Sequence, residues 1–179
     1  MFEGRWNPAW IALLKDRSTP LRKRLIEFYR HYSEATYRPD WIRIHMHAGL
    51  TDPTLNVRYI QLVRSELMPV YCREPRHECG LPDTDAEVTE QEIEFVWSLH
   101  GGIFYMAMRE HVHQTRIKVD FMIHVALVVD NFLAGAQTTF PRLLATFARA
   151  ALDKSPAVPS AVLLCEAARR LKPIRAPAR

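Results

Sequence analysis

The amino-acid sequence predicts an all-α protein of about six to eight helices. No long stretch alternates apolar and polar residues, and no Asn-Gly or Asp-Gly pair separates two β-rich runs. Apolar residues instead recur at spacings of three and four. Two expected helices, at residues 93–108 and 120–136, are apolar around nearly their whole circumference. An ordinary surface helix needs one apolar stripe, so these two need cover on both sides.

Four helices are expected in the first half of the chain. Prolines near their starts and glycine or acidic residues near their ends set the boundaries. Gly49 is expected to end the third helix. Pro69 should kink the fourth, because it removes a backbone donor and clashes with the preceding turn. The four helices cover residues 8–16, 19–32, 39–49 and 52–80.

Three more helices are expected after an acidic loop at residues 81–89. Thr89 and Glu92 have the spacing of a capping box, which is a strong local start signal. Gly135 should close the second of these helices, and Pro141 should lie in the first turn of the third. The three helices cover residues 90–113, 118–134 and 139–152.

The net charge of +4 comes from the C-terminal part of the chain. Residues 142–179 hold eight Lys or Arg and two acidic residues. Residues 1–141 hold sixteen Lys or Arg and eighteen acidic residues, so this part of the chain is slightly acidic. A nucleic-acid-binding domain usually has a basic face, and the basic run at 22–24 is expected to be a solvated helix face. We predict one domain at residues 1–153 and a basic, proline-containing tail at 154–179.

We expect a cytoplasmic protein that does not contact membranes. The N-terminus lacks the apolar segment of a signal peptide, and the cysteine count of three is odd. Cys72 and Cys79 are seven residues apart on a helix, about 10.5 Å along its axis, which is too far for a disulfide. Neither apolar helix reaches the ~18–20 uncharged apolar residues of a membrane span.

The sequence predicts neither an enzyme nor a cofactor site. No nucleophile motif, P-loop or dinucleotide fingerprint is present, so no catalytic residue is assigned. His45 and His47 would point about 200° apart on a helix and cannot chelate together. A metal site assembled across helices from His45, His100 and His124 is an open alternative. Hydrogen-bonded histidines in a core or pocket are the favoured interpretation, with no metal.

The two apolar helices predict a homodimer. A domain of this size has one core, so we expect residues 93–108 and 120–136 to form a four-helix bundle with their copies about a two-fold axis. The expected interface residues are Ile103, Met106, Phe121, Val125, Val128 and Phe132. The pair Gly101-Gly102 lies mid-helix, which suggests a close backbone approach, a ligand against the helix, a bulge or merely tolerated packing.

Aromatic side chains and histidines share helix faces in a way that predicts a small-molecule pocket. Trp41 and His45 are four residues apart, and Trp97, His100 and Phe104 are three and four apart. Apolar walls with a few polar groups are typical of ligand pockets, and also of a well-packed core. The predicted ligand-binding residues are Trp41, His45, Tyr59, Val63, Trp97, His100 and Phe104.

Several segments resemble, in their order, the C-terminal regulatory domain of TetR-family transcriptional regulators. They are FEGRWNPAWIALLKDRSTPLRKRLIEFYRHY, WIRIHMHAGLTDPTLNVRYIQLVRSELMPVYCRE, EFVWSLHGGIFYMAMREHV and VDNFLAG, and the resemblance runs from about Phe2 to Ala136. It implies that the last two long helices form a dimeric four-helix bundle and that the others enclose an effector cavity. Effector binding in this family releases DNA, a coupling between two sites. The family's N-terminal helix-turn-helix domain is not matched in this chain.

We therefore expect an effector-sensing and dimerisation domain of a TetR-like repressor. Its effector would be a small hydrophobic or aromatic molecule. The protein would contact DNA only through a helix-turn-helix domain that this chain lacks. The alternative is a stand-alone, all-α dimeric binding or assembly protein without a role in DNA regulation. A helix-turn-helix in frame upstream of Met1 would favour the first, and a stop codon with a ribosome site the second. A third hypothesis, a metal-dependent enzyme built on the cross-helix histidines, is tested by metal analysis.

Overall fold

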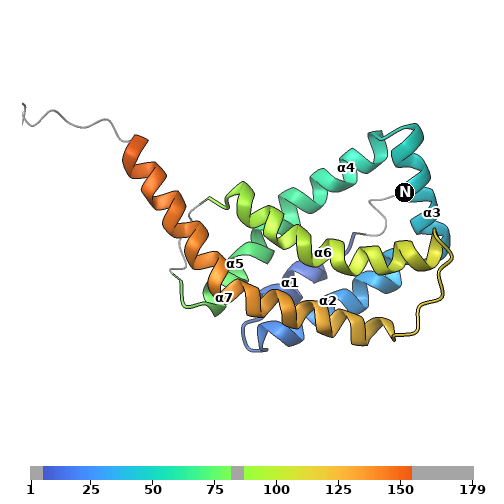
Figure 1. Ribbon diagram of the computed structural model, residues 1–179, viewed down its shortest axis with the longest axis horizontal. Helices are drawn as coiled ribbons and strands as arrows, with labels where there is room; N and C mark the ends of the chain where they lie inside the picture. Colours follow the sequence, from blue (N-terminus) through green and yellow to red (C-terminus); the bar gives the residue numbers. More distant parts are fainter. Residues whose placement is uncertain (1–5, 82–86, 155–179) are drawn as a thin grey trace, which may run out of the picture. The chain divides into compact units, whose positions relative to one another are not determined.

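The computed structural model describes residues 6–81 and 87–154, and these residues form helices without any strand (Figure 1). This confirms the all-α prediction. The elements are α1 (Ala9–Lys15), α2 (Leu21–Thr36), α3 (Pro39–Thr51), α4 (Thr54–Leu62), the π-helical segment η2 (Val63–Leu67), α5 (Met68–Glu78), α6 (Glu90–His111) and α7 (Phe121–Lys154). The chain divides into two compact units, Met1–Ala145 and Thr146–Arg179. Except for Lys154, the predicted tail lies outside the described residues.

The core is built around the aromatic side chains of α2. Phe28 and Tyr29 are completely buried. The Phe28 ring packs against Trp10 of α1 with 5.8 Å between ring centroids, and against Tyr32 and Tyr71 with 5.4 Å. Edge-to-face and offset aromatic pairs of this kind each add about 0.5–1.5 kcal/mol beyond the area that they bury.

Buried ion pairs fix α5 to its neighbours. Glu74 of α5 accepts hydrogen bonds from Arg24 of α2 at 2.7 Å and from Arg17 at 3.1 Å. Arg76 of α5 forms a two-pronged ion pair with Glu92 of α6, and both N···O distances are 2.6 Å. Burial favours the neutral form of Glu92, but hydrogen bonds from Arg76 and Thr89 lower its pKa below the ordinary value. The predicted capping box of Thr89 and Glu92 is confirmed.

The expected kink near Pro69 takes the form of a π-helical turn. Pro69 has no N–H, and its ring would clash with the carbonyl of Ser65 in a regular α-helix. The preceding segment, η2, relieves this clash by widening, and the Met68 N–H bonds to the Val63 carbonyl five residues earlier. Val63 and Leu67 are both buried at this turn.

The predicted break in the last helix is wrong, because α7 runs continuously through Gly135 and Pro141. A Cβ at 135 would lie 3.5 Å from the Phe95 ring of α6, which is an ordinary van der Waals contact, so this position packs against α6 inside the helix. The buried stripe continues across Gly135 at spacings of three and four and ends just before Pro141; it comprises Val125, Val129, Phe132, Ala136 and Phe140. Tertiary packing of this stripe outweighs the local helix-breaking preferences.

Helix α7 is also long and apolar enough, over Phe121–Phe147, to be a candidate membrane span by length and composition. Core helices of soluble proteins pass the same test. One side of α7 is buried in the subunit, and Asp130 pairs with Arg22 of α2 at 2.6 Å. Ile123 and Leu127 are exposed. The membrane candidate therefore remains weak.

Four of the six predicted interface residues lie in the core of the single chain: Ile103, Met106, Val125 and Phe132. Phe121 and Val128 are partly buried. The periodicity of a helix that is apolar all round does not tell which face its own subunit covers. The apolar side chains left exposed on these helices include Tyr105, Ile123 and Leu127, so these residues are the better candidates for an intersubunit contact.

We predict that Glu92→Ala lowers the free energy of unfolding by about 3–5 kcal/mol, because it leaves the buried Arg76 guanidinium without its partner. Glu90→Ala is the matched control. Glu90 lies two residues earlier and pairs with Arg64 on the exposed surface, so its loss should cost less than about 1 kcal/mol. Urea unfolding of both variants measures the difference, and equal losses would contradict the role assigned to the buried pair.

Candidate functional site

The candidate site is a pocket lined by residues of α2, α3, α4 and the middle of α6. Its volume is about 180 Å³. Its lining is mostly aromatic and aliphatic, and it comprises Tyr32, Thr36, Trp41, Ile42, His45, Tyr59, Ile60, Trp97, His100, Gly101 and Phe104. A pocket of this kind, with apolar walls and a few polar groups, is typical of a small-molecule site.

Six of the seven residues predicted from the sequence line this pocket: Trp41, His45, Tyr59, Trp97, His100 and Phe104. Val63 does not line it, because it is buried at η2. The sequence reasoning missed Tyr32 and Thr36 of α2, because contacts between distant segments leave no trace in local spacing. Ligand binding by these residues stays a prediction.

Polar groups on the pocket wall form hydrogen bonds with neighbouring side chains. The hydroxyls of Tyr32 and Tyr59 hydrogen-bond to each other. Behind the wall, the buried Tyr29 hydroxyl lies 3.5 Å from Nδ1 of His100. Burial raises the pKa of Tyr29 and of Tyr59, so these phenols stay protonated at neutral pH.

His100 is the centre of the aromatic wall. Its ring lies 5.4–6.4 Å, centroid to centroid, from four aromatic rings, those of Tyr29, Tyr32, Trp97 and Phe104. Desolvation in these surroundings lowers the pKa of His100 to about 4, and the nearby His45 adds to the shift. Burial also lowers the pKa of His45. The residues known to line the pocket include no Asp, Glu, Lys or Arg, so its wall is uncharged at neutral pH.

The α3–α4 connection holds His45 in place. Asn56 of α4 donates a hydrogen bond from Nδ2 to the His45 carbonyl, with an N···O distance of 2.9 Å. A side chain at Gly49 would meet this nitrogen at 2.8 Å. The predicted helix end at Gly49 is wrong, because α3 continues to Thr51. The glycine instead makes room for the contact between α3 and α4.

The two adjacent glycines of α6 have different surroundings. Gly101 lines the pocket, and a side chain there would meet no atom within 4 Å. Gly102 lies against α7: its carbonyl is 3.1 Å from Nε2 of His124, and a Cβ at this position would be 3.3 Å from Val128. Gly101 therefore belongs to the pocket wall, and Gly102 lies where α6 and α7 approach each other closely.

The described residues contain no group of three His, Cys, Asp or Glu side chains that could hold a metal ion. His45 and His100 share the pocket, whereas His124 is engaged with the Gly102 carbonyl. The structure therefore does not bring the three histidines of the metal hypothesis together.

Cys72 and Cys79 are both free, as their spacing predicted. Burial raises the pKa of Cys72 to about 12, so its thiol is a poor nucleophile at neutral pH. The third cysteine, Cys165, lies outside the described residues.

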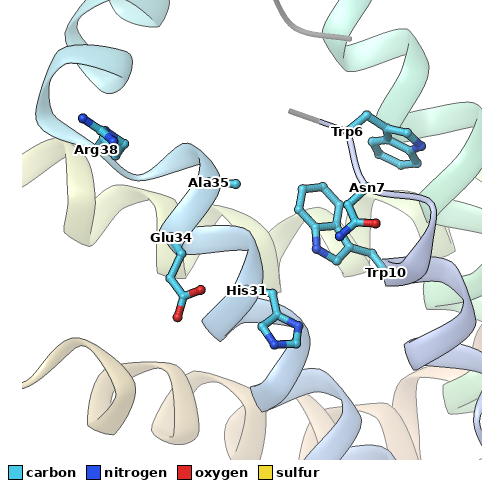
Figure 2. Close-up of a pocket in the computed structure, with 7 residues that line it drawn as sticks. All are labelled: Trp6, Asn7, Trp10, His31, Glu34, Ala35 and Arg38. Atoms are coloured by element: carbon cyan, nitrogen blue, oxygen red, sulfur yellow. The ribbon is translucent and has the colours of Figure 1, made fainter. Parts of the chain in front are cut away.

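A larger and more open hollow of about 720 Å³ lies beside α1 and α2 (Figure 2). Trp6, Asn7 and Trp10 form one side. Across from them are His31, Glu34, Ala35 and Arg38. Its charged side chains already have partners within the chain: Glu34 pairs with Arg30 at 2.9 Å, and Arg38 lies 3.6 Å from Asp40. We therefore favour the smaller, more enclosed pocket as the functional site.

Comparisons of the chain with models of protein families, with curated protein sequences and with solved structures find no match.

The surroundings of the two glycines predict opposite preferences. Gly101→Ala should raise the free energy of unfolding by about 0.5–1 kcal/mol, because alanine is the better helix former and meets no neighbour. Gly102→Ala should gain less or lose stability, because its methyl group presses on Val128. Urea unfolding of the two variants checks the order, and an equal gain in both would show that α7 does not crowd Gly102.

The low pKa of His100 predicts a loss of stability in acid. Between pH 6.5 and 4 the unfolded chain binds a proton at this residue that the folded chain does not, so the free energy of unfolding should fall as the pH falls. With a folded pKa near 4, the loss from pH 7.5 to 5 is about 2 kcal/mol for this residue. Urea unfolding of the unaltered chain and of His100→Phe at the two pH values isolates the contribution of His100. An identical pH dependence in the variant would contradict the lowered pKa of this residue.

Proposed function

We propose that this chain is a small-molecule-sensing domain that works as a homodimer, as its resemblance to TetR-family regulatory domains implies. The observation that carries the proposal is the aromatic pocket between α2, α3, α4 and α6. Well-packed cores contain few voids larger than a water molecule. A pocket of about 180 Å³ with mainly apolar walls is better suited to taking up a ligand than to stabilising the fold alone.

The dimer is supported by apolar side chains that the subunit leaves uncovered. Tyr105 of α6 and Ile123 and Leu127 of α7 are each more than half exposed. An exposed apolar surface on these two helices would suit an interaction site if the side chains form one patch. A two-fold contact through α6 and α7 would cover them and would place the contact on the helix that also supplies His100 and Phe104 to the pocket.

A role in transcription follows from the resemblance alone. In that role the pocket would sense a small hydrophobic or aromatic effector, and a helix-turn-helix domain would bind the operator. The body of the chain, residues 1–141, is slightly acidic and offers no obvious surface for DNA.

Ligand uptake is tested with benzene, which an apolar cavity of comparable size is known to accept. Benzene at a concentration well above its dissociation constant should raise the melting temperature of the chain, because it binds only the folded state. Gly101→Leu should abolish this rise by filling the pocket mouth, and Gly101→Ala is the matched control that leaves the mouth open. The absence of any rise in the unaltered chain would mean that the pocket is only an imperfect part of the core.

Dimer formation is tested by light scattering at micromolar concentration. We expect the unaltered chain to be a dimer and Leu127→Asp to be a folded monomer, because a carboxylate in the apolar contact would lose its hydration. Leu50→Asp changes a leucine that is even more exposed, in the last turn of α3, and should remain dimeric. A monomeric wild-type chain would refute this part of the proposal.

A further inference from the structure

We infer that the pocket takes an uncharged aromatic molecule carrying a hydrogen-bond acceptor, and that His100 of α6 is the residue that selects the acceptor. This inference rests on the proposed function, since it names the ligand class of the same pocket. It follows from the size of the pocket, from the state of its polar groups and from the absence of charged groups in its known lining.

The size limits the ligand to one substituted ring or a small fused pair. An apolar cavity of ~150 Å³ holds benzene, and this pocket measures about 180 Å³. Trp41, Trp97 and Phe104 supply flat walls from α3 and α6. Aromatic rings pack against one another edge-to-face or offset, so a planar aromatic ligand matches these walls better than a branched aliphatic one.

His100 supplies a directed donor. Its Nδ1 lies 3.5 Å from the Tyr29 hydroxyl, and this phenol is protonated at neutral pH and can donate to the nitrogen. In a neutral imidazole, a nitrogen that accepts leaves the proton on the other nitrogen. With this pairing the proton of His100 is on Nε2, for which the described residues provide no hydrogen-bond partner, although the ring lines the pocket. A carbonyl or ether oxygen on the ligand would accept from this N–H.

The hydroxyls of the wall do not compete for this role, and the Thr36 hydroxyl donates to the Tyr32 carbonyl at 2.6 Å. The hydroxyls of Tyr32 and Tyr59 are hydrogen-bonded to each other, so the protein already satisfies them. In the empty pocket water can pair with the His100 donor. A ligand that accepts from His100 replaces that water, whereas a purely apolar ligand of the same shape would leave the donor buried without a partner, at a cost of about 1–3 kcal/mol.

Charged ligands are excluded because the pocket has nothing to balance them. Its known lining contains no acidic or basic side chain apart from two histidines, and both are held neutral by burial. A carboxylate or ammonium group would lose its hydration on entry without gaining an ion pair. Selection for neutral molecules is therefore built into the pocket wall.

The test uses four probes of equal size, each with nine non-hydrogen atoms: acetophenone, isopropylbenzene, benzoate and α-methylbenzylamine. The first carries a neutral acceptor, the second has none, and the last two carry a negative and a positive charge at pH 7.5. Dissociation constants are measured by titration calorimetry, with tryptophan fluorescence of Trp41 and Trp97 as a second readout. Each titration is done on the unaltered chain and on His100→Phe, whose ring has nearly the same shape and no donor.

We expect acetophenone to bind, and both charged probes to bind at least 100-fold more weakly. His100→Phe should weaken acetophenone binding about 10-fold or more, which corresponds to the loss of one buried hydrogen bond. The same substitution should leave isopropylbenzene binding unchanged or tighter, because it replaces a polar ring with an apolar one. His47→Phe, which makes the same change at a histidine that does not line this pocket, should change the ratio of the two affinities less than threefold.

Three outcomes would overturn the inference, and they separate it from the proposed function. If acetophenone and isopropylbenzene both bind and His100→Phe affects them equally, the pocket binds ligands but His100 does not select the acceptor. If benzoate or the amine binds best, the ligand class is wrong. If no probe binds while benzene also fails to stabilise the chain, the proposed function fails together with the inference. A circular-dichroism melt of each variant establishes that it is folded.

Discussion

The packing of aromatic rings around His100 is the constraint on which the pocket depends. Four rings from α2 and α6 surround this imidazole, and they remove the water that would stabilise its charged form. The histidine is therefore neutral at neutral pH, and its Nδ1 lies 3.5 Å from the Tyr29 hydroxyl. Three of these rings, those of Tyr32, Trp97 and Phe104, line the pocket together with residues of α3 and α4.

The same helix, α6, links the pocket to the rest of the subunit. Its first turn is fixed to α5 by the buried pair of Arg76 and Glu92. Its middle presents Gly101 to the pocket and Gly102 to α7. A ligand in the pocket therefore touches a helix whose other side packs on α7, and the exposed apolar residues of α6 and α7 lie on these same two helices. This arrangement gives a physical route between the pocket and the proposed dimer contact.

Local spacing was sufficient to predict most of the pocket and insufficient to predict which faces pack together. Trp97, His100 and Phe104 lie on one helix face, and the side chain of each lines the pocket, as the spacing indicated. Tyr32 and Thr36 were missed because they come from α2, far away in the sequence. The interface residues were chosen from helices that are apolar on every side, and periodicity does not distinguish the side that faces the subunit core from the side that faces outward. Ile103 and Val125, which were predicted to lie in the dimer interface, are instead fully buried within the subunit.

Helix boundaries failed where packing outweighs local preference. Gly135 and Pro141 are helix breakers in isolation, yet α7 passes through both, and its buried stripe is continuous across Gly135 as far as Phe140. Pro69 did disturb its helix as expected, but as a π-helical turn whose form depends on the buried Val63 and Leu67. The start of α6 was predictable because the capping box is a local interaction between Thr89 and Glu92.

The most direct test of the pocket is a nuclear magnetic resonance spectrum of the chain, labelled with ¹⁵N at histidine, with and without acetophenone at pH 7.5. Our account predicts a neutral His100 with its proton on Nε2, a shift of that N–H resonance on binding, and nuclear Overhauser contacts from the ligand methyl group to Trp97 and Phe104. Contacts confined to the open hollow at Trp6 and Trp10, with the His100 resonances unmoved, would contradict it.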